Sequence, residues 1–206
     1  MLAFRHPFTA IVSGPTQCGK STFVLMLIRN ASTMIHPPPQ DIIYCYSEYQ
    51  SAFMGPGLQT VEFHEGLPET DRFDGKRRTL LVIDDLMDEA GESVSKIFTK
   101  ISHHRNVSVV FLTQNLFHKN KHMRTMSLNT HYMILFKNPR DVTQFAALAR
   151  QMYSTGWKFA VEAFKDATSS TAHSYLLVDL KPDTEERFRL RTSVFPGEDT
   201  YVYVRK

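Results

Sequence analysis

Long hydrophobic runs are scarce in this sequence of 206 residues. The longest covers only residues 23–28, whereas a helix that spans a bilayer needs roughly 20 apolar residues. The first residues, MLAFRHPF, also contain no apolar stretch of the kind found in a secretory signal. We therefore expect an intracellular protein that works away from membranes.

Cysteine is almost absent, because the chain contains only Cys18 and Cys45. Two cysteines cannot build a disulfide framework, and alone they cannot form a zinc site. This usage is typical of a reducing compartment. Internal repeats and low-complexity tracts are missing as well, which favours one globular domain with a single core.

Acidic residues are missing from one long segment. Residues 96–150 contain nine Lys or Arg but a single acid, Asp141, which gives this segment a net charge of +8. The rest of the chain has a net charge of −5, and five of the nine histidines also fall in the basic segment. Such polarisation favours a polyanionic partner, although a basic face exposed only to solvent remains the alternative.

The hydrophobic pattern predicts an α/β fold. Most of the short β-branched or aromatic runs lack alternation, which indicates strands buried on both faces of a parallel sheet. Five such strands are expected at residues 8–13, 41–46, 79–83, 107–113 and 132–136. Helices are expected between them at residues 20–31, 92–101 and 141–152. This alternation predicts a mostly parallel sheet flanked by helices.

The end of the chain has a different pattern. Short strand-like runs at residues 174–180, 187–190 and 200–204 are separated by Lys-Pro-Asp and Phe-Pro-Gly turns. We interpret residues 151–206 as an antiparallel β extension at the edge of the sheet. Residues 1–150 form the core of the same single domain, 1–206, and residues 47–78 are expected to be rich in loops.

One motif identifies the chemistry of this core. The stretch GPTQCGKS matches G-x-x-x-x-G-K-S, the phosphate-binding loop, and it lies between a predicted strand and a predicted helix. Gly14 and Gly19 allow the backbone to turn its N–H groups toward phosphate oxygens. Lys20 would reach the β- and γ-phosphates, and Ser21 would bind Mg²⁺. The predicted nucleotide-binding residues are Gly14, Pro15, Thr16, Gln17, Cys18, Gly19, Lys20, Ser21 and Thr22.

Polar residues follow two other predicted strands. The run TLLVIDD places Asp84 and Asp85 at the carboxyl edge of the sheet, where ligands of α/β proteins bind. Asp84 is the candidate Mg²⁺ ligand and Asp85 the candidate general base, with an N-cap role as the alternative for Asp85. After the next strand, Gln114 or Asn115 would contact the attacking water and the γ-phosphate, and we favour Gln114.

Positive charge at the transition state often comes from the arginine of a neighbouring subunit. Arg105, just before the strand at 107–113, is the first candidate, with Arg140 and Arg124 as alternatives. Residues 117–124, FHKNKHMR, are interpreted as a basic loop that follows a phosphate backbone. The loop contains few aromatic residues, which favours duplex over single-stranded DNA.

Together GPTQCGKS, LLVIDD and HHRNVSVVFLTQN resemble viral genome-packaging ATPases of the FtsK/HerA-type branch of P-loop motors, over about residues 8–150. The resemblance implies a RecA-like fold of the ASCE class and a ring, hexameric or pentameric, that moves double-stranded DNA into a capsid or portal vertex. It implies ATP and Mg²⁺ as cofactors, with Lys20, Ser21, Asp84 and Gln114 in the roles given above. In relatives the catalytic acid is often glutamate, so Asp85 departs from their pattern. The expected location is the host cell, nucleus or cytoplasm, at the assembly site or in the virion.

Other P-loop proteins remain alternatives. A viral helicase or replication ATPase usually shows an Asn sensor and an added origin-binding domain, for which 206 residues leave no room. A nucleotide kinase would use Asp85 on a substrate hydroxyl, and a nucleotide switch would bind a capsid or membrane partner. Stimulation of ATP hydrolysis by duplex DNA would separate the translocase and the helicase from the kinase and the nucleotide switch.

Overall fold

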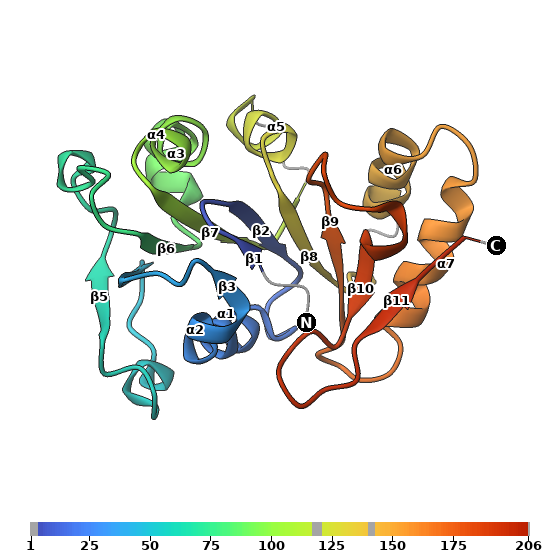
Figure 1. Cartoon of the computed structure of the whole chain (residues 1–206), viewed down its shortest axis with the longest axis horizontal. Helices are drawn as coiled ribbons and strands as arrows, with labels where there is room; N and C mark the ends of the chain where they lie inside the picture. The colour runs from blue at the N-terminus through green and yellow to red at the C-terminus, as the bar shows by residue number, and fades with distance from the viewer. Residues whose placement is uncertain (1–3, 117–120, 140–142, 206) are drawn as a thin grey trace.

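The computed structural model describes residues 4–116, 121–139 and 143–205. Within these ranges the chain forms a nine-stranded sheet in the order β11-β10-β9-β8-β2-β7-β6-β4-β5, with helices on both faces (Figure 1). The strands from β5 to β8 in this order are parallel, and those from β9 to β11 are antiparallel to their neighbours. The predicted α/β fold with antiparallel C-terminal strands is therefore confirmed. The predicted β extension at 151–206 is wrong in part, because it also contains the helix α7 (Trp157–Ala167).

The strands of the main sheet are short, and most are buried along their whole length. They are β2 (Thr9–Ser13), β4 (Asp41–Tyr46), β5 (Val61–Glu65), β6 (Thr79–Asp84), β7 (Val107–Thr113), β8 (Tyr132–Phe136), β9 (Tyr175–Asp179), β10 (Leu190–Thr192) and β11 (Tyr201–Tyr203). A separate parallel pair joins β1 (Phe4–Arg5) to β3 (Ile35–His36). The five core strands were predicted to within about one residue. The edge strand β5 was not, because its side chains are only half-buried.

The predicted strand at 187–190 is wrong. Residues Glu186–Phe188 form a 3₁₀ turn, and the strand β10 begins only at Leu190. The Arg189 guanidinium ties this turn to the loop before it, because it donates hydrogen bonds to the Glu186 carboxylate and to loop carbonyl oxygens, those of Asp179, Lys181 and Thr184. A side chain that satisfies loop carbonyls in this way leaves no sign in hydrophobic periodicity.

The helices divide between the two faces of the sheet (Figure 1). Helices α1 (Lys20–Arg29) and α2 (Ala31–Met34) cover one face. The other face is covered by α3 (Met87–Lys96), α4 (Ser102–His104), α5 (Lys121–Leu128), α6 (Thr143–Met152) and α7 (Trp157–Ala167), with a π-helical turn, η3 (Ile97–Ile101), between α3 and α4. None of these helices is long and apolar enough to cross a bilayer, as far as the described ranges go.

The predicted basic loop at 117–124 needs correction. Residues 117–120 lie outside the described residues, and Lys121 begins helix α5 rather than continuing a loop. Met123 and Met126, three residues apart, are both buried on the side of the helix that packs toward the core. Lys121 and Arg124 are exposed. The spacing of the two methionines is that of an amphipathic helix, whereas the basic residues around them favour a loop when the sequence is considered alone.

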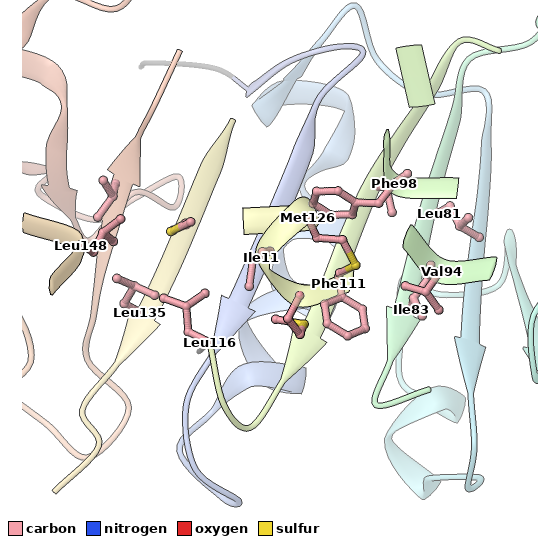
Figure 2. Close-up of a cluster of buried hydrophobic side chains, with 14 of the residues drawn as sticks. Ile11, Leu81, Ile83, Val94, Phe98, Phe111, Leu116, Met126, Leu135 and Leu148 are labelled. Carbon is pink, nitrogen blue, oxygen red and sulfur yellow. The ribbon is translucent and has the colours of Figure 1, made fainter. Parts of the chain in front are cut away.

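Each central strand contributes side chains to two hydrophobic cores, one on each face of the sheet. On the α3–α7 side, Ile11, Ile83 and Phe111 from the strands pack with Phe98 and Met126 (Figure 2). Alternate residues of the same strands pack against α1 and α2 on the other side. This double burial explains the continuous apolar runs, and it holds the carboxyl ends of β2, β6 and β7 at one edge of the sheet.

Candidate nucleotide-binding site

The phosphate-binding loop connects β2 to α1, as its motif predicts. Its first residue, Gly14, is bonded to β7, the strand beside β2 in the sheet, because the Gly14 N–H donates to the Thr113 carbonyl oxygen at 3.2 Å. Gln17 and Gly19 have positive φ angles of 64° and 106°, which curl the loop before α1 begins at Lys20. The loop therefore ends at a helix N-terminus, where unpaired backbone N–H groups favour an anion.

Gly14 has no room for a side chain. A Cβ atom there would lie 2.6 Å from the Cys18 Sγ and 2.7 Å from the Phe136 Cβ. Cys18 is itself buried, and burial raises the pKa of its thiol. Cys18 thus fills space beneath the loop as a thiol that is mostly protonated at neutral pH.

We expect Gly14→Ala to distort the loop, because the Phe136 Cβ cannot move away without displacing β8. The free energy of unfolding should fall by about 1–3 kcal/mol, as in other overpacked sites. Urea denaturation of both proteins measures this change. Gly66→Ala is a suitable comparison, since a Cβ at Gly66 meets nothing within 4 Å and adds only the strain of its positive φ. Equal losses in the two variants would contradict the packing explanation.

The Lys20 ammonium lies across the loop. Its Nζ donates to the carbonyl oxygens of Gly14 at 2.7 Å and Pro15 at 3.0 Å. These two contacts keep the charge at the mouth of the loop, where a phosphate would replace the carbonyl oxygens as its partner. The contact of Lys20 with a bound triphosphate stays a prediction.

Asp84 lies at the buried end of β6 and is held by a residue that the sequence did not reveal. Tyr44, from the neighbouring strand β4, donates its hydroxyl to the Asp84 Oδ2 at 2.7 Å. The Ser21 side chain lies close enough to this phenol to act on its pKa, so Tyr44 lies near both predicted Mg²⁺ ligands. Burial raises the pKa of Asp84, and the nearby Asp85 adds to this, while the bond from Tyr44 opposes it.

This pair of oxygen donors suits magnesium. Mg²⁺ binds through one or two protein oxygens together with water and phosphate oxygens. Ser21 would supply a hydroxyl and Asp84 a carboxylate, and the Tyr44 hydroxyl holds that carboxylate. These residues fit the ion, which would neutralise phosphate charge at this edge of the sheet.

Asp85 and Gln114 meet at the ends of β6 and β7. The Gln114 Nε2 donates to the Asp85 Oδ2 at 3.0 Å, and the Thr16 hydroxyl donates to the Gln114 Oε1 at 3.3 Å. A hydrogen-bonded chain thus extends from the phosphate loop through an amide to an exposed carboxylate. Asp85 has a φ of 54°, a strained backbone conformation that is frequent in active sites. Such an arrangement can orient a water molecule and accept its proton.

The structure separates Gln114 from Asn115, which the sequence could not do. The Asn115 Oδ1 accepts a hydrogen bond from the Gln144 Nε2 of α6 at 2.8 Å. Asn115 is therefore engaged on the side of α6, whereas Gln114 contacts both the loop and Asp85. The role of Gln114 as the sensor stays a prediction.

Arg105 lies away from the phosphate loop of its own chain. It precedes β7, whereas Gln114 follows it, and the seven residues of β7 span about 23 Å. Its guanidinium donates to the Phe73 carbonyl oxygen and borders a polar pocket of about 280 Å³. A role for Arg105 in a neighbouring subunit's site stays a prediction. Arg124 is exposed on α5, and Arg140 lies outside the described residues.

Comparisons with known proteins bear on the fold. No family model matches the sequence, and no curated protein matches it. Among solved structures, the genome packaging NTPase B204 from Sulfolobus turreted icosahedral virus 2, in complex with ATP-gammaS, superposes with a TM-score of 0.51 at 11% identity, over 97% of this chain and 98% of B204. The flagellar accessory protein FlaH from Methanocaldococcus jannaschii superposes with a TM-score of 0.51 at 9% identity, over 98% of this chain and 92% of FlaH.

The chain has the P-loop NTPase fold. The likeness extends over nearly the whole of both compared chains, so it includes the region that we interpreted as an extension. At these identities the superpositions establish architecture, and any shared chemistry must be argued from the residues of this chain.

Proposed function

We propose that this protein is an ATP-driven translocase of double-stranded DNA that packages a viral genome. ATP would bind at the loop with Mg²⁺ on Ser21 and Asp84, and a water held by Gln114 and Asp85 would attack the γ-phosphate. The observation that carries ATP hydrolysis is the hydrogen-bonded chain from Thr16 through Gln114 to Asp85. The superposition on a viral genome packaging NTPase supports the choice of a packaging role.

The partner is inferred from charge. The basic segment 96–150 has seven Lys and Arg residues that are described and exposed, namely Lys96, Lys100, Arg105, Lys121, Arg124, Lys137 and Arg150. None of them forms a salt bridge to a described side chain, whereas many arginines elsewhere do. Basic side chains without acidic partners are available to phosphates of a nucleic acid.

The assembly and its setting complete the proposal. A homo-oligomeric ring, hexameric or pentameric, would place Arg105 of one subunit near the loop of the next and surround the DNA. It would act in the host cell, nucleus or cytoplasm, at a capsid or portal vertex. Electron microscopy with an ATP analogue and duplex DNA would show the ring and the arginine that enters each site.

Duplex DNA should raise the rate of ATP hydrolysis severalfold. The double variant Lys121→Ala/Arg124→Ala should weaken DNA binding and lower the slope of log affinity against log salt by about 2, since two phosphate contacts are lost. Lys158→Ala/Lys165→Ala on α7 is the matched control, because it removes equal charge outside the basic segment. A rate that does not respond to DNA would contradict the translocase, and unwinding of a forked substrate would favour a helicase.

Tyr44→Phe should weaken the dependence of nucleotide binding on Mg²⁺, because Asp84 loses the hydroxyl that orients it. We expect the Mg²⁺ concentration that gives half of the full enhancement of nucleotide binding to rise about tenfold. Losses of this size are usual when a residue that orients a metal ligand is removed. Titration of a fluorescent ATP analogue with Mg²⁺ and in EDTA measures this effect. Affinity in EDTA should not change. Tyr46→Phe, on the same strand, is the control, and an unaltered Mg²⁺ curve for Tyr44→Phe would refute the role.

A further inference from the structure

A cavity distinct from the pocket beside Arg105 adjoins the phosphate loop. It has a volume of about 320 Å³ and lies between α1 and the C-terminal extension. Gly19 and Thr22 contribute to it from the loop and the first turn of α1. A ligand bound at the loop can therefore continue into this cavity without leaving the protein surface.

The cavity and the catalytic residues lie on opposite sides of the loop. In the sheet, β7 and β6 follow β2 in one direction and provide Gln114, Asp84 and Asp85. In the other direction come β8, β9 and β10, and the cavity is lined from this side. A triphosphate whose γ end points toward Asp84 consequently has its α end directed toward the cavity.

The cavity has the chemistry of a nucleoside site. Phe23, Tyr175 and Phe195 line it with a rigid aromatic surface, held by edge contacts with ring centroids 4.8 Å and 5.0 Å apart. Hydroxyl groups, the Glu198 carboxylate and the His173 ring surround this surface. An aromatic surface among hydrogen-bonding side chains, in a volume of about 320 Å³, suits a small ligand that is partly aromatic and partly polar.

His173 joins the cavity to the loop. Its Nδ1 lies 3.2 Å from the Cys18 carbonyl oxygen, and its side chain packs against Gly19 so closely that a Cβ there would approach within 3.2 Å. His173 is 155 residues from Cys18 in the sequence. The extension therefore contacts the loop directly instead of only adding strands to the sheet.

We propose that this cavity binds the base and ribose of the nucleotide whose phosphates occupy the loop. The C-terminal extension, through His173 and the cavity walls, then supplies the nucleoside half of the site. This inference rests on the proposed binding of ATP. It assigns to the extension a function in ligand binding that the loop motif does not include.

The test compares ATP with inorganic triphosphate, which has the phosphates but no nucleoside. Isothermal titration of the full chain should give about tenfold or more tighter binding for ATP. Met26→Trp fills the cavity from α1, and it should reduce this preference to about threefold or less while leaving triphosphate affinity unchanged. Met54→Trp is the matched control, because Met54 is 84% exposed and does not line the cavity.

The outcomes separate the two proposals. Lys20→Ala should weaken both ligands, since it acts on phosphates. His173→Ala provides a second variant in case Met26→Trp fails to fold. It should weaken ATP severalfold more than triphosphate, because triphosphate loses only the packing of His173 on the loop, whereas the exposed His104→Ala should change neither. Variants that retain the wild-type preference would overturn the nucleoside site alone. A wild-type protein that binds neither ligand would overturn the proposed function and this inference with it.

Discussion

Replacing Lys20 by alanine should reduce ATP hydrolysis at least about a hundredfold, the loss typical when one preorganised charge at a transition state is removed. The Lys20 Nζ already lies at the mouth of the loop, on the Gly14 and Pro15 carbonyl oxygens. A bound triphosphate would accept these bonds through its β- and γ-oxygens, and charge there increases during transfer. Phosphate release measured under saturating Mg²⁺ and duplex DNA gives the rate.

The matched control is Lys165→Ala on α7, which removes the same charge from an exposed position. It should hydrolyse ATP at the wild-type rate. Circular dichroism of Lys20→Ala should match the wild type, because the ammonium makes only two hydrogen bonds, both to carbonyl oxygens of the loop. A Lys20→Ala protein that retains hydrolysis would show that the loop does not bind the reacting phosphates.

The residues of the loop and of the strand ends could be predicted from the sequence, because each depends on local order. GPTQCGKS has a fixed spacing. Asp84 is the last residue of one buried strand, and Gln114 directly follows another. In a parallel sheet such positions meet at one edge whatever the loops between them do. The predicted phosphate-binding edge therefore required no knowledge of tertiary contacts.

Tyr44 and His173 could not be predicted, because both act through contacts between distant segments. Tyr44 reaches Asp84 from 40 residues away, and His173 reaches the loop carbonyl of Cys18 from 155 residues away. A tyrosine in a buried strand and a histidine in a polar turn are both common in proteins without any role in a site. Only the packing of β4 beside β6, and of the extension beside α1, gives these residues their positions.

Helix α5 illustrates a different limit of prediction from the sequence. Four basic or imidazole side chains among residues 118–122 favour an exposed loop, although Met123 and Met126 have helical spacing. Burial of these two methionines against the α3 side of the core determines the local structure more strongly than the flanking charge does. The exposed Lys121 and Arg124 remain available to phosphates, now from a rigid helix.

Asp85→Asn should reduce the rate of hydrolysis by about 10²–10⁴-fold, the usual contribution of a general base. Asparagine keeps the shape of the side chain, and its amide oxygen can still accept the hydrogen bond from the Gln114 Nε2. The variant thus removes the charge and the proton acceptor while it leaves the chain from Thr16 to Gln114 in place. Single-turnover hydrolysis measures the chemical step apart from product release.

ATP affinity and the rate of hydrolysis should respond differently to Asp85→Asn. ATP affinity should stay within about twofold of wild type, because phosphate contacts come from the loop and from Lys20. Asp71→Asn, exposed and remote from the loop, serves as the matched control and should hydrolyse ATP normally. Asp85→Glu should retain part of the activity, since glutamate preserves the base but extends past the Gln114 amide. A full rate for Asp85→Asn would assign Asp85 to the turn that ends β6, where its positive φ is a backbone feature, and would leave Gln114 alone to position the water.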